Sequence, residues 1–538
     1  MRNRDLDRLA ATTYDVLVVG GGIQGLTLAY EAAARGLRTA LVEAADYGSG
    51  ISFNHQKTVH GGLRSLQRGR IDRARQGIAE RRTLARIAPW LLRPLPFLMA
   101  THRSVTRGRM ALRVAFRIDE LLGRRRNDGL EPELHLPAPR LISRAATLRL
   151  FPGVRQAGLT GAAQWYDYQM VESERLTFAF AAAADRAGAD LANYVEAVAP
   201  VRDGARVAGM QVRDTLVGST FDVRAQATIN ATGARAGRLM TALGIRREVP
   251  LLRVVNFLTA KPARDIALAA PSPAGRMLTL VPWRGRALVG TLQSDDLVQP
   301  DACPPGAGEI ERHLRDANHA FPALELKAAD ITLVHCGAVP AVRGRNGTPE
   351  IAPDPSILDH TAEGAPGAFT VIGVKYTTAR AVAERAIDTV GRRLGRRLPR
   401  STTATTVLPG AGIADHEALA IETGRAMDLE VPAGTVKHLI ARYAESAADI
   451  VRLTGDRPEL RESVAPGAQT LAAEVVHVIR QEHAIRLSDI VIRRTALGAA
   501  GPPPEDALRR CAELAAAELG WNAERVRAEI DSVRAFYR

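Results

Sequence analysis

One stretch near the N-terminus limits the choice of fold more than any other. It begins at Tyr14 and reads YDVLVVGGGIQGLTLAYEAAARGLRTALVEA. Its valine-rich start is short and bounded by glycine, as in a buried parallel strand. Gly20, Gly22 and Gly25 then form a G-x-G-x-x-G turn before an alanine-rich helix, and a second short strand ends at Glu43. Strand, turn, helix, strand and acid together predict a dinucleotide-binding unit.

Each part of this unit has a physical task in holding a nucleotide. The glycines let the backbone approach a pyrophosphate, and the helix N-terminus stabilises its negative charge. The acid accepts hydrogen bonds from ribose hydroxyls. We therefore expect Gly20, Gly22 and Gly25 to line the phosphates and Glu43 to contact the ribose. The fingerprint by itself does not separate NAD from FAD.

The segment after Glu43 does separate them. A nicotinamide dehydrogenase would continue into regular βα units, whereas this chain enters the polar, glycine-punctuated passage DYGSGISFNHQKTVHGGLRSLQRG. With Lys57 and the residues His60–Arg64, this passage resembles FAD-dependent glycerol-3-phosphate dehydrogenases. The resemblance continues in the same order at INATGARAG, LVPWRGRALVGT, GVKYTTARAVAERA and LSDIVIRRTALG. It therefore covers most of the chain, from about Tyr14 to Leu497.

The resemblance implies a fold. The class is α/β: a glutathione-reductase-like FAD-binding domain (a ββα dinucleotide fold), an antiparallel β substrate domain and an all-α C-terminal domain. We expect the oxidoreductase domain over residues 14–400 and the helical domain over 401–538. Within the first, we assign flavin binding to about 14–100, 160–240 and 335–400, and substrate binding to about 101–159 and 241–334.

The resemblance also implies which residues line the FAD. Besides the fingerprint, the expected cofactor-binding residues are Ser52, Lys57, Gly61, Gly62, Ala231, Thr232, Gly233, Gly373 and Thr377. The Gly-Gly pair permits close backbone approach. Thr377 and Thr378 are natural caps for the helix that follows GVKYTT. The N-terminus of that helix, aimed at the flavin, would stabilise the negative charge of a reduced isoalloxazine.

Three residues are candidates for chemistry on the substrate. Arg64 offers a guanidinium fork suited to a phosphate or carboxylate. Lys375 is one of only five lysines among 72 Lys and Arg residues. Its ammonium can fix an alcohol oxygen, or take a proton if burial lowers its pKa. His60 completes the set, although a histidine beside glycines suits a structural hydrogen bond equally well.

The expected reaction is oxidation of a secondary alcohol in an anionic (phosphorylated or acidic) polyol, with hydride passing to flavin N5. The reduced flavin would be reoxidised by quinone, oxygen or a protein carrier. Two alternatives stay open. One is an amine, amino-acid or hydroxy-acid flavin oxidase of the same superfamily, which would not explain the C-terminal match. The other is a non-catalytic basic flavoprotein.

Four positions around the expected substrate site depart from the family pattern: Val339 replaces an arginine, Ser65 a tyrosine, Asn256 a histidine and Val374 a glycine. Losing one charge-assisted contact costs about 1.5 to 3 kcal/mol. We therefore expect glycerol-3-phosphate to be a poor substrate and a larger anionic alcohol to be preferred. Arg343 or Arg345 is the candidate replacement anchor.

The net charge of +14 raises the question of a nucleic-acid partner. Aromatic residues make up only 4% of the chain, too few for a base-stacking platform, so we expect no nucleic acid. The passage THRSVTRGRMALRVAFRIDELLGRRR mixes apolar residues with arginines at helical spacing. It fits an interfacial membrane helix as well as a solvated basic one, so peripheral contact with the inner face of the membrane stays open.

The cysteines and the N-terminus bear on the compartment. Cys303, Cys336 and Cys511 are odd in number and scattered, which predicts neither a disulfide framework nor a metal site. His477 and His483 are six residues apart, which also argues against a metal. The N-terminal region lacks the pattern of a secretory signal, and no apolar run reaches the roughly 18 to 20 residues of a membrane span. We expect a reducing, cytoplasmic location.

Beyond residue 400, the sequence predicts helices over Asp415–Met427, Gly434–Tyr443, Ala465–Arg480, Leu487–Ala496 and Pro504–Arg538. We interpret this region as a cover or an oligomerisation element, which leaves a homodimer open.

Overall fold

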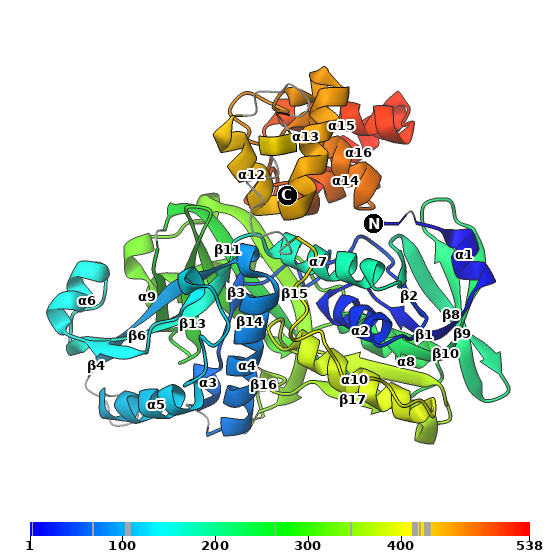
Figure 1. Ribbon diagram of the computed structural model, residues 1–538. Coiled ribbons are helices and arrows are strands. Elements are labelled where there is room, and N and C mark those ends of the chain that lie inside the picture. The colour runs from blue at the N-terminus through cyan, green and yellow to red at the C-terminus, as the bar shows by residue number, and fades with distance from the viewer. Residues whose placement is uncertain are drawn as a thin grey trace. The chain divides into compact units, whose positions relative to one another are not determined.

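The computed structural model describes residues 1–2, 4–66, 69–102, 109–263, 265–344, 347–410, 418, 421–423, 425 and 432–537, without the side chains of Arg64 and Ala433. The chain divides into two compact units (Figure 1). The first unit is made of Met1–Phe53, Glu172–Val249 and Ala352–Arg538, and the second of Asn54–Val171 and Pro250–Ile351. The expected division into flavin-binding and substrate-binding parts stays a prediction, because compactness alone does not show what a segment binds.

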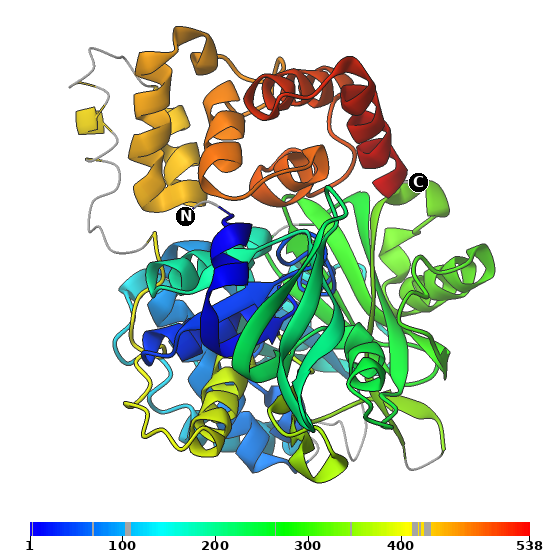
Figure 2. The same ribbon diagram turned by 90° about the vertical axis from the view of Figure 1, so that its right-hand side faces the viewer.

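The first unit contains an eight-stranded mixed sheet. Its parallel centre has the order β18-β10-β1-β2-β7, and β17, β8 and β9 add antiparallel strands. Figure 2 shows the long strands of this unit in green. The strands are β1 (Thr13–Val19), β2 (Thr39–Val42), β7 (Asp190–Ala192), β8 (Val195–Asp203), β9 (Arg206–Asp214), β10 (Thr220–Asn230), β17 (Ser356–Asp359) and β18 (Ala368–Ile372). Six of the seven residues of β1 are buried, which confirms the predicted buried parallel strand.

Helices cover this sheet. Before residue 400, the longer helices of this unit are α2 (Ile23–Ala34), α7 (Ser173–Arg186) and α10 (Ala379–Arg393), and the shorter ones are α1 (Leu6–Ala11) and α8 (Ala236–Ala242). α2 packs against both α7 and α10 (Figure 1). Their buried faces are rich in alanine, whose small side chain lets helices approach closely.

The second unit is built on a ten-stranded sheet with the order β16-β15-β11-β14-β13-β12-β4-β6-β3, with β5 on β6. Apart from the parallel pair β12 and β4, its strands pair antiparallel. They are β3 (Thr58–Val59), β4 (Leu92–His102), β5 (Arg140–Ile142), β6 (Leu159–Met170), β11 (Leu251–Pro262), β12 (Ala267–Pro271), β13 (Met277–Trp283), β14 (Arg286–Leu297), β15 (Ile331–Arg343) and β16 (Pro349–Ile351). The segment VPWRGRAL forms a hairpin between β13 and β14, and Trp283 lies fully in the core.

Among the described residues, the α-helices that accompany this sheet are α3 (Leu63–Leu66), α4 (Ile71–Ile87), α5 (Arg109–Leu122), α6 (Arg144–Leu150) and α9 (Ala307–Ala320). α9 packs on β14. Leu314 and Ala317 of this helix join a core with Phe257 and Val289 of the sheet. The alternation of apolar residues along these strands is what gives the sheet its buried face.

The C-terminal part of the first unit is helical, drawn in orange and red (Figures 1 and 2). It contains α12 (Ala433–Tyr443), α13 (Ala447–Asp456), α14 (Ala472–Gln481), a π-helix (Asp489–Arg494), α15 (Glu505–Leu519) and α16 (Ala523–Phe536). No helix was predicted from the sequence at the position of α13. The helix expected from Ala465 begins only at Ala472, because Pro466 and Gly467 precede a bridge that involves Leu471. Most of the helix expected over Asp415–Met427 lies outside the described residues.

Two further expectations about this region are corrected. The segment Leu487–Ala496 forms a π-helix over its central six residues rather than an α-helix. The single helix expected over Pro504–Arg538 is two helices, because Gly520 takes a left-handed conformation with φ +69° and ends α15.

The prediction that the cysteines form no disulfide is wrong. Cys303 and Cys336 are bonded, with their Cα atoms 6.0 Å apart, and Cys511 is buried as a free thiol. Their separation of 33 residues did not indicate a disulfide, because only the return of the chain along β15 brings Cys336 near Cys303. Within the described residues, no helix is both long enough and apolar enough to cross a membrane.

Candidate active site

Four strands of the first unit end at one edge of its sheet. Val19 of β1 lies opposite Val42 of β2 and Asn230 of β10, and Asn230 lies opposite Thr370 of β18. Because these strands are parallel, the segments that follow them leave from the same edge, where α/β folds bind their ligands. These segments carry the sequence-predicted residues Gly20, Glu43, Ala231, Thr232, Gly233 and Gly373.

The turn between β1 and α2 requires glycine at two positions. Gly20 has φ +109°, and a Cβ there would lie 2.7 Å from the carbonyl oxygen of Ala231. A Cβ on Gly25 would lie only 1.7 Å from the carbonyl oxygen of Gly20. At Gly22, the N-cap of α2, the only described atom within 4 Å of an added Cβ is Ser52 Oγ at 3.3 Å. This bare start of a 12-residue helix fits a pyrophosphate.

Two side chains border this turn. The Glu43 carboxylate accepts hydrogen bonds from the amides of Gly21 and Ala45, at 2.5 and 2.8 Å. Burial raises the pKa of Glu43, against the opposing effect of these two amides. Ser52 Oγ accepts a hydrogen bond from the amide of Ile23 at 2.9 Å, which holds Ser52 at the start of α2. The contact of Glu43 with the ribose and of Ser52 with the flavin remain predictions.

A buried asparagine braces the segment after β10. Asn230 donates to the carbonyl oxygen of Ala236 at 2.9 Å, and its Oδ1 accepts a hydrogen bond from the Thr232 hydroxyl at 2.7 Å. Ala231 is buried and Gly233 has φ +59°. The chain therefore passes this edge of the sheet with small residues in a fixed conformation, as expected of a second pass along the cofactor.

The third segment expected along the cofactor is the turn between β18 and α10. A Cβ on Gly373 would lie 2.3 Å from the side chain of Gln24, so the turn packs directly on α2. Gln24 donates to the carbonyl oxygen of Lys375 at 3.4 Å, and the Lys375 side chain is exposed. The expectation that Thr377 and Thr378 cap α10 by hydrogen bonds is wrong. Thr378 is the N-cap but makes no side-chain capping bond, because its ψ of 7° is far from the extended value of a capping residue.

In the second unit, Lys57 is fully buried and has φ +56°. Its ammonium lies 5.2 Å from the centre of the Trp283 ring, a cation–π arrangement. Burial lowers the pKa of nearby His335 well below its ordinary value, and the Lys57 charge lowers it further. Lys57 therefore interacts with Trp283 and His335 inside the second unit. Its predicted contact with the flavin stays a prediction.

His60 is held by a residue that the sequence analysis missed. Its Nδ1 lies 3.1 Å from Oδ2 of Asp167, a buried residue of β6. The glycines that follow His60 serve packing. A Cβ on Gly61 would lie 2.3 Å from Nη1 of Arg81, and one on Gly62, at φ +94°, would lie 3.0 Å from the backbone of α4. An acid in the apolar alternation of WYDYQM was the available signal for Asp167.

The predicted anion anchors are placed only in part. The backbone of Arg64 lies in α3, but its side chain is outside the described residues, as is all of Arg345. Arg343 is exposed at the end of β15. The roles of Arg64 and of the two alternative arginines stay predictions.

Comparison with known proteins places this geometry in a family. The family described as FAD dependent oxidoreductase matches residues 15–389, and the one described as C-terminal domain of alpha-glycerophosphate oxidase matches residues 401–526. Glycerol-3-phosphate dehydrogenase 2 of Mycobacterium tuberculosis is 32% identical over 97% of this chain and 88% of its own length. Glycerol-3-phosphate dehydrogenase of Synechocystis sp. is 30% identical over 92% of this chain and 90% of its own.

The chain belongs to the FAD-dependent glycerol-3-phosphate dehydrogenase family. It is an FAD-dependent oxidoreductase, and the glycine turn at Gly20 and Gly25 is a cradle that fits the pyrophosphate of that cofactor. The glycerol-3-phosphate dehydrogenase of Bacillus halodurans complexed with FAD shares its fold, with a TM-score of 0.77 at 22% identity over 99% of this chain and 97% of that one. L-proline dehydrogenase of P. horikoshii shares only part of it, with a TM-score of 0.51 at 17% identity over 72% of this chain.

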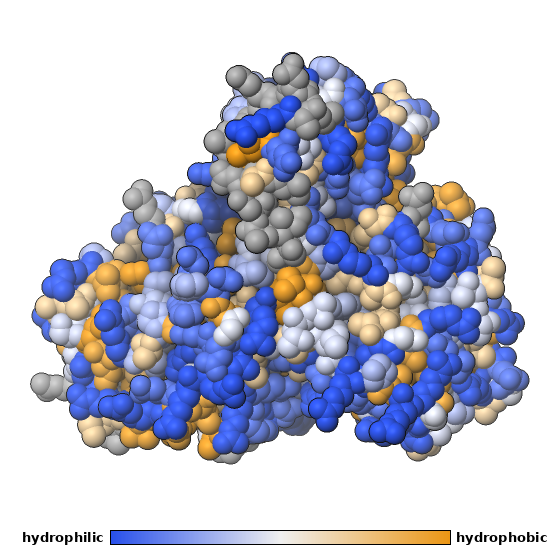
Figure 3. All heavy atoms as spheres, in the orientation of Figure 1, coloured by the Kyte–Doolittle hydropathy of each residue, from blue (hydrophilic) through white to orange (hydrophobic). Residues whose placement is uncertain are grey.

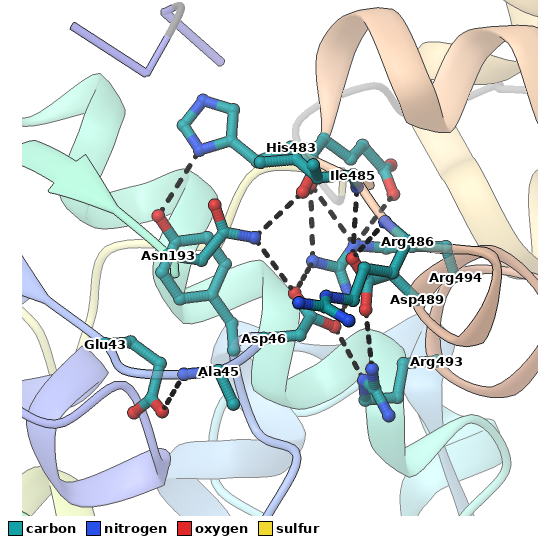
Figure 4. A network of polar contacts seen from close by, with 12 residues as sticks. Glu43, Ala45, Asp46, Asn193, His483, Ile485, Arg486, Asp489, Arg493 and Arg494 are labelled. Carbon is teal, nitrogen blue, oxygen red and sulfur yellow. Dashed lines mark hydrogen bonds and ion pairs between the residues drawn. The ribbon is translucent and has the colours of Figure 1, made fainter. Parts of the chain in front are cut away.

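A buried ionic network joins the C-terminal helices of this flavoenzyme to the segment that follows Glu43 (Figure 4). Asp46, which is fully buried, accepts hydrogen bonds from Arg493 at 2.6 Å and from both terminal nitrogens of Arg494 at 2.8 and 3.0 Å. Burial alone would raise the pKa of Asp46, but the charges of Arg494 and Arg493 outweigh it and lower that pKa. Arg493 also donates to Asp489 at 2.7 Å.

Two more buried ion pairs join α7 and its N-cap residue Glu172 to the C-terminal region. Arg175 binds Glu482 through both of its terminal nitrogens, at 2.6 and 2.8 Å, and Arg442 binds Glu172 at 2.6 Å. The adjacent arginines in IVIRRTALG were the visible signal for this network, but nothing in the sequence identified their partner.

We predict that Gly22→Ala weakens FAD binding by at least about tenfold while leaving the protein folded, because its Cβ occupies the space for phosphate but meets only Ser52 Oγ. Flavin titration of the apoprotein measures the dissociation constant. Gly237→Ala is the matched control, since no described atom lies within 4 Å of its added Cβ. Normal FAD affinity in Gly22→Ala would refute the assignment of the phosphate turn.

We also predict that Arg494→Met lowers the free energy of unfolding by about 3 to 5 kcal/mol, because it leaves a buried carboxylate short of a counter-charge. Arg509→Met is the control, since its pair with Glu505 is exposed and should be worth less than about 1 kcal/mol. Denaturant unfolding of both variants measures the difference. Equal losses would show that the network has no special role in stability.

Proposed function

We propose that this enzyme oxidises a secondary alcohol in an anionic polyol, as its relatives' names indicate for glycerol-3-phosphate. The observation that carries the proposal is the match at residues 401–526 to the C-terminal domain of alpha-glycerophosphate oxidase, together with relatives similar along nearly the whole chain. An amine or amino-acid oxidase of the same superfamily would account for the nucleotide-binding part alone.

Bound FAD supplies the hydride acceptor. In our proposal, Arg64 binds the anionic group of the substrate and Lys375 orients the hydroxyl that is oxidised. Lys375 is exposed in the turn between β18 and α10. His60, whose ring is about half exposed, takes the hydroxyl proton. Quinone, oxygen or a protein carrier as the electron acceptor, and a homodimeric assembly, stay predictions of the sequence.

The family departures in the second unit support a preference for a substrate other than glycerol-3-phosphate itself. Asn256 is buried on β11, and its Oδ1 accepts a hydrogen bond from the Thr291 hydroxyl at 3.0 Å. Its side chain is therefore hydrogen-bonded to the neighbouring strand β14. Val339 lies on β15 opposite Leu252 and carries no charge for an anion. Neither position therefore supplies a charged hydrogen-bond donor to a small phosphate. We propose that the preferred substrate is a larger anionic alcohol.

We predict that anaerobic mixing with such an alcohol bleaches the visible absorbance of the flavin, and that glycerol-3-phosphate does so only at concentrations roughly tenfold to a hundredfold higher. A panel of phosphorylated polyols, sugar acids, 2-hydroxy acids and amino acids provides the comparison. Bleaching by micromolar glycerol-3-phosphate would contradict the proposed preference. Bleaching by amino acids alone would contradict the proposed function.

Lys375→Met tests the role of the lysine in the same assay. We predict a bleaching rate about 100-fold lower, because the hydroxyl loses the charge that orients it. Lys437→Met, an exposed lysine on α12, is the matched control and should bleach at the normal rate. Equal rates in both variants would remove Lys375 from the site.

We propose that α5 lies on an anionic membrane surface. Its inner face packs through Leu112 and Phe116, whereas Met110, Val114 and Leu121 are 69%, 59% and 55% exposed. Arginines lie next to these apolar residues, as in helices that bind the membrane interface. Figure 3 shows hydrophobic surface between hydrophilic side chains where Figure 1 labels α5.

We predict that the protein floats with liposomes containing anionic lipid at low salt, and that Val114→Asp with Leu121→Asp abolishes flotation, because two carboxylates cannot enter the interface cheaply. Val217→Asp is the control, since Val217 is 77% exposed and belongs to the first unit, whereas α5 belongs to the second. Wild-type protein that stays entirely in the soluble fraction would refute the membrane contact.

A further inference from the structure

The side chain of His60 is held at both ring nitrogens. Nδ1 lies 3.1 Å from Oδ2 of Asp167, and Nε2 lies 2.8 Å from Oγ1 of Thr58. The ring also stands edge-on to Phe97, with ring centres 5.7 Å apart. A side chain that is about half exposed is thus confined to one orientation by three contacts.

Both oxygens of the Asp167 carboxylate have hydrogen-bond partners. Its Oδ1 accepts hydrogen bonds from the amide of Gly61 at 2.7 Å and from Nη1 of Arg81 at 2.5 Å. Its Oδ2 faces His60 and the indole nitrogen of Trp165 at 3.3 Å. Burial alone would raise the pKa of Asp167, but the Arg81 charge and the hydrogen bond with His60 outweigh it and lower that pKa. The carboxylate is therefore ionised and can only accept hydrogen bonds.

This arrangement determines where the histidine carries its proton. Because Asp167 only accepts, Nδ1 of His60 must donate, and the neutral ring then has its lone pair on Nε2. The Thr58 hydroxyl can donate to that lone pair. An imidazole with a carboxylate on Nδ1 and a basic Nε2 is the arrangement used by general bases that accept a proton from a hydroxyl.

We propose that Asp167 is a positioning residue that holds His60 in the Nδ1-protonated tautomer, with Thr58 as a second brace on Nε2. The proposal rests on the proposed function, in which the substrate hydroxyl gives its proton to Nε2 while the hydride leaves from the carbinol carbon to the flavin. In that step Nε2 exchanges the hydrogen bond from Thr58 for the substrate proton: the substrate O–H bond breaks and an N–H bond forms at Nε2. His60 becomes a cation, which the Asp167 carboxylate stabilises.

The variant Asp167→Asn tests this directly. The donors from Gly61 and Arg81 keep the amide oxygen of the new side chain at the Oδ1 position, so its NH2 group faces His60. Nδ1 must then accept a hydrogen bond, and the ring changes to the Nε2-protonated tautomer. We expect the ¹⁵N resonances of histidine-labelled protein to report this exchange at His60. The signals are assigned by their loss in His60→Gln.

Anaerobic stopped-flow mixing measures the consequence. We expect the maximal rate of flavin bleaching in Asp167→Asn to fall by about 100-fold or more, with a substrate dissociation constant changed by less than about threefold, since Nε2 can no longer accept the proton. Thr58→Val should keep the tautomer and lower the rate by only about tenfold. Asp119→Asn is the matched control, because this buried acid pairs with Arg126 rather than with His60.

Two outcomes would overturn the proposal. An unchanged tautomer in Asp167→Asn would show that Asp167 does not determine the proton position, and this readout needs no substrate, so it stands apart from the proposed function. A changed tautomer with an unchanged bleaching rate would show that His60 is not the proton acceptor. A merely structural Asp167 would lower the midpoint of thermal unfolding and the flavin content while leaving both readouts as in wild type.

Discussion

The close contact between the start of α2 and the end of β1 is the constraint on which the nucleotide-binding part depends. A Cβ on Gly25 would lie 1.7 Å from the carbonyl oxygen of Gly20, so the helix can follow the strand in this way only without a side chain there. This turn sets the direction of α2, and both α7 and α10 pack against α2. The segment after β10 packs against Gly20, and the turn after β18 packs against Gln24 of α2.

The C-terminal helices add a second constraint through charge. Asp46 is buried three residues after Glu43, and the two arginines of the π-helix neutralise it (Figure 4). A buried carboxylate without such partners would be very costly. The C-terminal region also supplies the partners of Arg175 on α7 and of Glu172, the N-cap residue of that helix. The C-terminal helices therefore hold the segment that carries the predicted ribose contact and are more than a cover.

In the second unit, the Gly-Gly pair after His60 is needed for packing, which the sequence pattern did not indicate. Close approach to a flavin was the expected reason for two glycines, but the structure shows that a side chain at Gly61 would overlap Arg81. Arg81 must lie there because it donates to Asp167, and Asp167 contacts His60. The motif thus combines packing with the placement of a titratable side chain.

The sequence by itself determined the nucleotide-binding turn, the choice of FAD over NAD and the family. These depend on contacts among residues close in the chain or on segments that occur in a characteristic order. Only the tertiary structure decided the partners of His60 and Asp46, which lie 107 and 448 residues away, and the bond between Cys303 and Cys336. Strand register and helix docking bring such residues together, and no local pattern of residues encodes either one.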